Sequence, residues 1–255
     1  MSIGPLLRDW RTRRRLSQMD LALEAGVSTR HLSFVETGRS KPSQAMLLRL
    51  AEELEVPLRE RNRLLLAAGF APVYEERSLD APEMRPVADA VELVLRGHEP
   101  HPALAVDRGW ALVANNDAAA MLLEGIPEEL LAPPLNVLRV ALHPDGLAPR
   151  IRNLAEWRDH LLERLRRQIA VTGDPALQTL FDELAAYPVP DPGAELMPRS
   201  DVVVPLRLDT DAGELTFLST VTTFGTPVDI TVEELMIETF FPADERTAAV
   251  LRAAA

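Results

Sequence analysis

The sequence contains no cysteine among its 255 residues. This absence excludes a disulfide scaffold, a thiol nucleophile and a zinc site built from thiolates, and it suits a reducing compartment such as the cytoplasm. Lysine is almost as scarce, because Lys41 is the only one among 27 basic side chains. The chain also lacks an N-terminal apolar segment of the signal-peptide kind and any apolar run long enough to cross a membrane. We therefore expect a cytoplasmic protein with no membrane partner.

The charge that is present is unevenly distributed along a chain whose length suits two domains. Residues 1–79 carry 13 basic and 10 acidic side chains, whereas the remaining residues carry 14 basic and 29 acidic ones. Most of the chain would repel a polyanion, and only the N-terminal part would tolerate one. A run of arginines between residues 8 and 15 is either a solvated helix face or a contact surface for an anion.

Short helices are predicted throughout the first 70 residues, because capping residues and glycines recur at close intervals. Ser17, Ser28 and Ser43 are typical N-caps. Gly26 and Gly69 are typical helix terminators. The pattern predicts a compact all-α domain over residues 1–75, with five helices near residues 5–15, 18–25, 29–36, 44–54 and 58–68.

The third of these helices has an outward face rich in hydrogen-bond donors. At about 100° per residue, Leu32 and Val35 point toward the core. The side chains on the outward face are Thr29, Arg30, Ser33 and Phe34. Arginine, serine and threonine can read base edges in the major groove, and an apolar ring can contact a thymine methyl group. The face is therefore predicted to contact DNA bases, with Phe34 either at a thymine methyl or packed at the rim.

Side chains suited to phosphate groups surround this helix. Gln18 opens the preceding helix, where a side chain and the helix N-terminus can both reach a phosphate. Arg39 and Lys41 lie on either side of a short turn after the third helix and would suit a second phosphate.

The segment LSQMDLALEAGVSTRHLSFVETGRSKPS, residues 16–43, resembles the helix-turn-helix of the XRE family, the Cro and phage-repressor type. The turn glycine Gly26, the small Ala22 and the pattern ExGRxxP from Glu36 onward match that motif in register. The resemblance covers residues 4–69 and implies binding to double-stranded DNA. It implies that Thr29, Arg30, Ser33 and Phe34 face bases, and that Gln18, Thr37, Arg39 and Lys41 hold phosphates. Arg11 and Arg15 are further candidates for phosphates; Arg15, where many members have glycine, is alternatively an ordinary C-cap.

A proline-rich and charged stretch without a clear period follows, so the domain boundary is expected near residues 72–82. The second domain, residues 76–255, has mixed patterns that predict an α+β fold with about five antiparallel strands and helices on one side. Strands are expected at residues 103–115 with a turn between two of them, and at 202–208, 214–224 and 235–241. Helices are expected near 84–94, 117–123, 151–169 and 175–184, with a capping box at Thr231–Glu234 and a last helix after Asp244.

The segments LVANNDAAAMLL, NVLRVALHPDG and VTTFGTPVDITVEELMIETFFPADERT resemble the ligand-binding domain of MmyB-type regulators. These are XRE proteins with a PAS-like C-terminal domain. The resemblance extends over residues 84–252 and implies a pocket for a fatty-acid-like ligand and a homodimer. Two copies of a helix-turn-helix domain related by two-fold symmetry would read a palindromic operator.

Large apolar side chains of the second domain occur on elements that this resemblance places around its ligand. They are Leu122, Leu138, Trp157, Leu161, Phe217, Val221 and Phe224. Arg139, Arg150 and Thr223 are candidates to meet a carboxylate head group. The same apolar positions would also suit a plain core without a ligand.

The sequence has no glycine-rich phosphate loop, HExxH or GxSxG motif, and we expect neither an enzyme nor a metal site. Prolines after Glu99 and His101 favour extended chain, and no third ligand is implied, so His98 and His101 are interpreted as loop residues. We expect no cofactor, and a fatty acid or similar lipid-like molecule as the ligand. The prediction is a one-component transcription regulator that responds to a small hydrophobic ligand. The alternative is a DNA-binding regulator whose C-terminal domain only dimerises or binds another protein.

Overall fold

The computed structural model describes residues 2–189 and 202–254. It divides the chain into two compact units. The first unit extends to Arg77 and also contains the short segments Ala170–Thr172 and Thr226–Glu233. The second unit begins at Ser78. Residues 226–233 were assigned by sequence to the second domain, so their place in the first unit is a difference that only long-range packing could produce.

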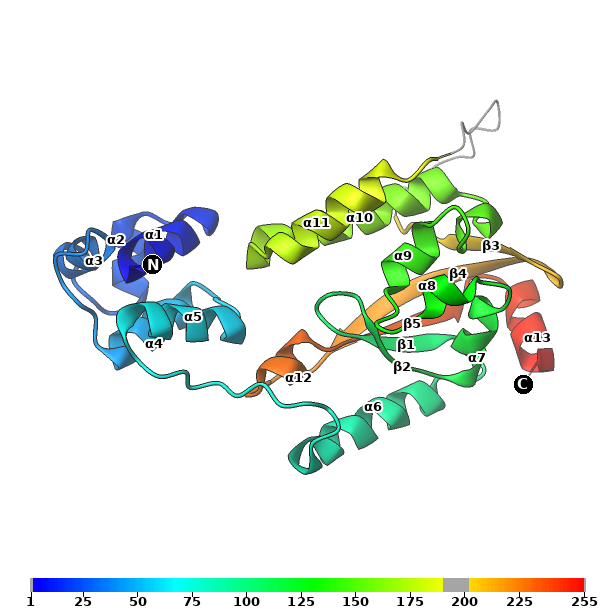
Figure 1. The fold of residues 1–255 in the computed structure, drawn as a ribbon, viewed down its shortest axis with the longest axis horizontal. Helices are drawn as coiled ribbons and strands as arrows, with labels where there is room; N and C mark the ends of the chain where they lie inside the picture. Colours follow the sequence, from blue (N-terminus) through cyan, green and yellow to red (C-terminus); the bar gives the residue numbers. More distant parts are fainter. Residues whose placement is uncertain (1, 190–201, 255) are drawn as a thin grey trace. The chain divides into compact units, whose positions relative to one another are not determined.

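The first unit contains five short helices connected by tight turns (Figure 1). The side chain of Ser17 accepts a hydrogen bond from the backbone N–H of Asp20, and the Asp20 carboxylate accepts one from the N–H of Ser17. This capping box satisfies two donors at the start of the second helix. Gly69 ends the fifth helix with a φ of 88°, a conformation that favours glycine. The helices are α1 (Ile3–Arg13), α2 (Gln18–Glu24), α3 (Thr29–Glu36), α4 (Gln44–Glu53) and α5 (Leu58–Ala68).

A five-stranded antiparallel sheet organises the second unit, with the strand order β2-β1-β5-β4-β3. Strand β5 lies in the middle, so its residue Glu238 is opposite Leu104 of β1 on one side and Val221 of β4 on the other. The α+β fold class predicted from sequence is confirmed. The strands are β1 (Ala103–Val106), β2 (Leu112–Asn115), β3 (Leu206–Thr210), β4 (Gly213–Thr223) and β5 (Met236–Pro242).

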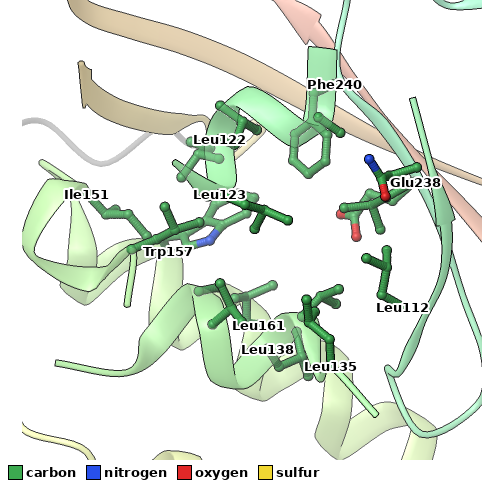
Figure 2. Close-up of a pocket in the computed structure, with 18 residues that line it drawn as sticks. Leu112, Leu122, Leu123, Leu135, Leu138, Ile151, Trp157, Leu161, Glu238 and Phe240 are labelled. Carbon is green, nitrogen blue, oxygen red and sulfur yellow. The ribbon is translucent and has the colours of Figure 1, made fainter. Parts of the chain in front are cut away.

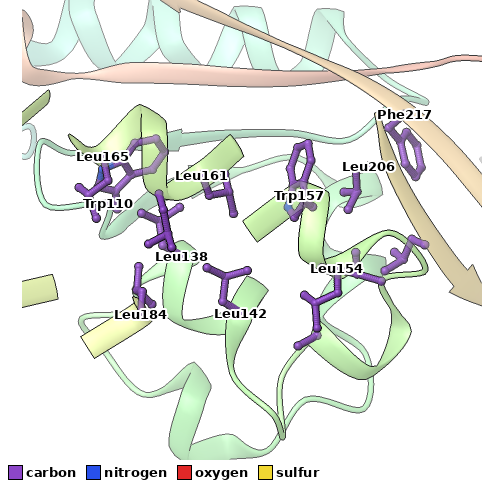
Figure 3. Close-up of a cluster of buried hydrophobic side chains, with 14 of the residues drawn as sticks. Trp110, Leu138, Leu142, Leu154, Trp157, Leu161, Leu165, Leu184, Leu206 and Phe217 are labelled. Carbon is purple, nitrogen blue, oxygen red and sulfur yellow. The ribbon is translucent and has the colours of Figure 1, made fainter. Parts of the chain in front are cut away.

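Helices cover both faces of this sheet, not one as the sequence predicted. Val91 and Leu95 of α6 pack against Ala103, Ala105 and Ile237 on one face. The other face packs against α9, α10 and α11 in the larger core shown in Figure 3. Strands β1 and β5 contribute side chains to the cores on both faces, because successive side chains of a strand point to opposite faces. The helices of this unit are α6 (Arg85–Gly97), α7 (Asp117–Ala120), α8 (Glu128–Leu131), α9 (Val137–Leu142), α10 (Leu154–Thr172), α11 (Pro175–Ala186) and α13 (Glu245–Ala254), with 3-10 turns η1 (Pro82–Met84), η2 (Met121–Leu123) and η3 (Ala148–Arg150).

Two local predictions differ from the structure. The strand expected from Val202 begins only at Leu206; Pro205 immediately before it has no N–H to donate to a neighbouring strand. The helix α12 (Ile230–Glu234) is capped by Asp229, whose carboxylate accepts the N–H of Thr231. The hydroxyl of Thr231 donates to the carbonyl of Arg77 and is therefore not the cap of a capping box.

Candidate DNA-binding and ligand-binding sites

The candidate recognition helix α3 is fixed by its cap and by two fully buried side chains. Ser28 accepts the N–H of His31 at 3.1 Å, which defines where the helix begins. Leu32 and Val35 are both 0% exposed in the core of the first unit. Because these two residues define the inward side, the predicted base-facing side is turned away from the core.

The predicted base-facing residues lie on one side of α3 and differ in how far their side chains are exposed to solvent. Thr29 and Arg30 are exposed, whereas Ser33 and Phe34 are half-buried. The Arg30 guanidinium carbon lies 5.3 Å from the centroid of the Phe34 ring, and that of Arg39 lies 6.0 Å from it. The ring therefore holds two cationic side chains on the exposed surface by cation–π contact. Both guanidinium groups therefore lie on the surface that the sequence predicts to face DNA.

The predicted phosphate contacts after α3 lie on an exposed turn. Thr37, Arg39 and Lys41 are all exposed. The Thr37 hydroxyl donates to the carbonyl of Ser33 at 2.7 Å and so extends the end of α3. Gly38 has a φ of 74°, which lets the chain turn between these side chains. Arg15 is exposed as well, with a φ of 58° directly after α1.

Arg11 differs from its predicted role because its side chain is turned inward. It is 13% exposed and forms a two-pronged ion pair with Glu36, at 2.7 and 3.0 Å, while its third nitrogen donates to the carbonyl of Leu16 at 2.8 Å. Gln18, also a predicted phosphate contact, donates to the same carboxylate at 2.8 Å. With every guanidinium nitrogen engaged, Arg11 does not fit a phosphate contact and instead links α1 to the end of α3.

Glu36 is therefore the buried centre that joins α1, α2 and α3. Burial alone would raise the pKa of its carboxyl, but the hydrogen bonds from Arg11 and Gln18 and the charge of Arg11 outweigh burial and hold the pKa below its usual value. Its partners lie 25 and 18 residues away in the chain. No local sequence pattern could have identified this cluster, although Glu36 itself belongs to the recognised motif.

Residues 226–233, which lie between β4 and β5 in the chain, are held within the first unit by hydrogen bonds and an ion pair. The N–H of Ile230 donates to the carbonyl of Glu75 at 2.9 Å, and Arg77 pairs with the largely buried Asp229 at 3.0 Å. Glu233 accepts the N–H of Leu58, at the start of α5, at 2.8 Å. These contacts pack residues 226–233 against the segment that follows α5 and against the start of α5.

The second unit contains an apolar cavity of about 90 Å³ within its larger core (Figure 2). It lies between the sheet and the helices on one of its faces, with α7 and η2 forming another wall. Of the predicted pocket residues, Leu122, Leu138, Trp157 and Leu161 line it. The full lining is Leu104, Leu112, Asn115, Ala119, Leu122, Leu123, Leu135, Val137, Leu138, Val140, Ala141, Leu147, Ile151, Trp157, Leu161, Leu206, Glu238 and Phe240.

The other predicted apolar residues lie outside this cavity. Phe217 is fully buried in the same core but does not line the cavity. Val221 is 42% exposed near the end of β4, where the sheet is less well covered. Phe224 packs instead against the core on the α6 side. The alternation of β4 identified the right strand, but it did not reveal where along the strand the covering helices end.

The predicted head-group residues are likewise engaged elsewhere. Arg139 forms an ion pair with Glu183 at 2.7 Å, and Arg150 donates to the backbone carbonyls of Leu122 and Glu124. Thr223 is exposed at the end of β4. Since none of the three lines the cavity, they do not fit the role of receiving a carboxylate there. Arg150 instead bonds to the backbone within η2 and directly after it.

Glu238, which sequence reasoning missed, is the charged residue of the cavity lining. Its side chain is 6% exposed and accepts a hydrogen bond from Arg164 at 2.8 Å. The Arg164 guanidinium in turn lies 4.5 Å from the centre of the Trp110 ring. Period-two alternation in residues 235–241 places Glu238 on the same face as Phe240, a signal that could have shown a carboxylate pointing toward the core.

Residues 2–189 and 202–254 also bear on metal binding and on membrane insertion. No group of three or more acidic or histidine side chains is arranged to hold a metal ion there. No helix within those ranges is long and apolar enough to span a bilayer. His98 and His101 contact each other edge to face and pack near Phe241.

Comparison with known families assigns both units. A helix-turn-helix family model matches residues 7–61, and a model described as the MmyB-like transcription regulator ligand binding domain matches residues 87–254. The chain thus combines a helix-turn-helix unit with a unit of the MmyB-like ligand-binding type. The chain belongs to the MmyB-like transcription regulator family, which is a family of regulators and not of enzymes.

Similar curated proteins carry the same general description. An uncharacterised HTH-type transcriptional regulator of Mycobacterium bovis is 31% identical over 130 residues. Relatives with the same description and identity occur in two strains of Mycobacterium tuberculosis. In each case the match covers 51% of this chain and 44% of the relative, so the chain aligns with less than half of the length of these proteins.

Proposed function

We propose that this regulator binds a palindromic operator as a homodimer and that a small hydrophobic, fatty-acid-like ligand in the second unit controls its affinity for DNA. The cavity is the observation that carries the ligand proposal. Its walls are aliphatic or aromatic apart from Asn115 and Glu238, and ligand sites of this kind combine an apolar enclosure with few polar groups. Burial of an alkyl chain contributes about 0.8 kcal/mol per methylene, so chain length should govern affinity.

A long alkyl chain requires the cavity to widen. The cavity of about 90 Å³ is smaller than the engineered cavity of about 150 Å³ that admits benzene. The wall that includes α7 and η2 is built from two very short helices, which make few internal hydrogen bonds and can move at small cost. Ligand binding is therefore expected to displace this wall, and that displacement is the conformational difference a regulator can use.

The exposed side of α3 supports the DNA part of the proposal. In a homodimer, two recognition helices would enter successive major grooves about 34–36 Å apart. A ligand changes DNA affinity only if it binds the DNA-competent and the incompetent dimer with different strength. Sedimentation of the full chain at micromolar concentration tests the dimer, and footprinting on whole operators and isolated half-sites tests the palindrome.

The ligand is tested by thermal unfolding of the full chain with saturated fatty acids of increasing length, together with mass spectrometry of molecules that co-purify. Stabilisation should rise with chain length until the pocket is full and then level off. Ala119→Phe fills the cavity, because Ala119 lines it and is 4% exposed. Ala120→Phe is the matched control, since its neighbour Ala120 is exposed and outside the lining.

The expected result is that Ala119→Phe abolishes the chain-length response and Ala120→Phe retains it. A flat response in the unmodified protein, with no co-purifying lipid, would favour the alternative function. In that case the second unit would serve only as a dimerisation or protein-interaction module.

A further inference from the structure

A groove of about 590 Å³ lies beside the apolar cavity of the second unit, and the two spaces share a wall. The side chain of Leu122, in η2, lines both of them. At the end of η3, Arg150 lines the groove, whereas its neighbour Ile151 lines the cavity. The groove is open to solvent at exposed residues such as Gly125 and Ala212. The η2 wall is therefore a thin barrier between the cavity and the surrounding water.

Arg150 bonds to the backbone of this wall in a way that a stronger acceptor could replace. Its guanidinium donates to the carbonyls of Leu122 at 3.3 Å, Glu124 at 3.2 Å and Asp209 at 3.3 Å. All three bonds are longer than the about 2.9–3.0 Å that is typical of such contacts. Within residues 2–189 and 202–254, Arg150 forms no ion pair with a carboxylate. A ligand carboxylate would be a better acceptor than these neutral carbonyls, because hydrogen bonds between two charged groups are shorter and stronger.

The two ends of the cavity differ in what they offer to an anionic head group. At one end Glu238 is already paired with Arg164. Another carboxylate there would meet Glu238 in a region of low dielectric, where like charges repel strongly. Figure 2 shows Leu122 and Ile151 across the cavity from Glu238. A ligand with an acidic head would therefore place its alkyl chain in the cavity and its head group on the Leu122 side, where Arg150 lies in the groove.

The acidic side chains that also line this groove are paired or exposed. Asp209 forms an ion pair with Arg152 at 3.1 Å. Glu124 and Asp211 are exposed, so solvent and salt screen their repulsion of an anion. Arg150, by contrast, is half-buried, where its charge is screened less. The groove therefore presents a guanidinium that favours an anionic group close to the cavity.

We propose that this groove is the entrance and head-group site of the cavity: the carboxylate of a fatty-acid-like ligand binds Arg150 in the groove, and its alkyl chain passes the η2 wall into the cavity. The proposal rests on the ligand-binding function proposed above and specifies where the acidic group lies. As the carboxylate accepts hydrogen bonds from Arg150, the guanidinium releases the carbonyls of Leu122 and Glu124. The wall is then free to move, so the head group couples ligand entry to displacement of η2.

Isothermal titration of the full chain with decanoate and methyl decanoate tests the head-group site, because the two probes share one alkyl chain and differ in charge. Decanoate should bind at least about tenfold more tightly than the ester, since only decanoate forms charge-assisted bonds with Arg150. Arg150→Met removes the charge and keeps a long apolar side chain, so decanoate should lose about tenfold in affinity. Methyl decanoate should bind this variant at least as tightly as the unmodified chain, because the bonds from Arg150 to the wall are gone.

Arg139→Met is the matched control. Arg139 is also an arginine of the second unit, but it pairs with Glu183 and lines neither the cavity nor the groove. This variant should leave the preference for decanoate unchanged.

The outcomes separate the two levels of the proposal. If methyl decanoate binds the unmodified chain as tightly as decanoate, the head-group site is overturned while the hydrophobic-ligand function stands. If Arg150→Met weakens both probes equally, Arg150 supports the wall without receiving the carboxylate, which also overturns the site. If neither probe binds, and none of the longer homologues does, the ligand function itself fails and the head-group site with it. The comparison of the two probes in the unmodified chain decides the question even if Arg150→Met does not fold.

Discussion

Leu32 and Leu50 in the first unit and Leu138 and Leu161 in the second are all nearly inaccessible to solvent, yet their surroundings differ. The first two are fully buried among the side chains of five short helices. The second two belong to a core that also borders the apolar cavity. A domain that binds DNA through α3 needs a fixed shape, whereas a domain that binds a ligand needs a core that can rearrange around it.

The charges follow the same division. The N-terminal residues 1–79 have a slight excess of basic side chains, and the rest of the chain has a large excess of acidic ones. In the first unit a buried carboxylate, Glu36, receives hydrogen bonds from both Arg11 and Gln18. In the second unit the buried Glu238 receives one from Arg164. The first carboxylate links three helices, whereas the second borders the apolar cavity.

The largest expected effect compares the two cores directly. Leu50→Ala should lower the free energy of unfolding of the first unit by about 3–5 kcal/mol, because a fully packed side chain is lost and leaves a new void. Leu161→Ala should cost the second unit only about 2 kcal/mol, since one side of Leu161 already faces a cavity and lacks dispersion contacts. Urea unfolding followed by fluorescence measures both, with Trp10 in one unit and Trp110 and Trp157 in the other. Equal losses would contradict the difference between the cores.

DNA binding should respond to two arginines of the first unit in different ways. Arg30→Ala should cost about 1–3 kcal/mol on the operator and relax the preference at one base pair, because a base contact is lost. Arg39→Ala should weaken operator and random DNA alike and reduce the salt slope by about one. Binding isotherms at several salt concentrations distinguish these outcomes.

Arg63→Ala is the control for both variants, because Arg63 is exposed on α5 and pairs with Glu60, away from the predicted DNA face. If Arg30→Ala leaves the ratio of operator to random binding unchanged, α3 does not read the bases as predicted.

Communication between the two functions is expected to depend on Asp229. Its pairing with Arg77 attaches the β4–β5 connection to the end of the DNA-binding domain. Asp229→Ala should leave the Kd for ligand nearly unchanged. The ligand-induced change in DNA affinity is typically about 5–150-fold in such couplings, and in this variant it should fall toward onefold. DNA titrations with and without a saturating fatty acid measure it. Retention of the full ligand effect would show that the signal takes another route.

The smallest effect concerns pH. Burial and the charge of Arg164 hold the pKa of His160 below its usual 6.5, against the opposing charge of Glu238. As the pH falls below that value, the unfolded chain binds the proton first, so the second unit loses stability. The pKa of Glu36 is held below 4.5, so its contribution to the first unit persists down to that pH and is lost only at lower pH.

A change from about pH 7.5 to about pH 5.5 should therefore lower the urea midpoint of the second unit more than that of the first. Urea unfolding at the two pH values measures both midpoints. His160→Asn should remove part of this difference, because the group that binds the proton is gone. A pH response that is the same with and without His160 would exclude this side chain as its source.

The sequence by itself determined the elements whose signals are local. Serines at positions 17, 28 and 43 cap helices because a side-chain oxygen meets an N–H three residues later. The spacing of Leu32 and Val35 gave α3 its inward and outward sides, and the family motifs identified both domains. Alternation located β4 and β5 to within one residue at each end, since a strand exposes its period directly.

The tertiary structure alone decided which of these side chains meet. Arg11 and Glu36 are 25 residues apart, Arg164 and Glu238 are 74 apart, and Arg77 and Asp229 are 152 apart. A periodic pattern gives the direction of a side chain within its own element but not the neighbour that packs against it. For that reason Leu138 and Trp157 line the cavity, whereas Val221 and Phe224 do not. The pairing of Glu238 with Arg164 depends on β5 packing against α10.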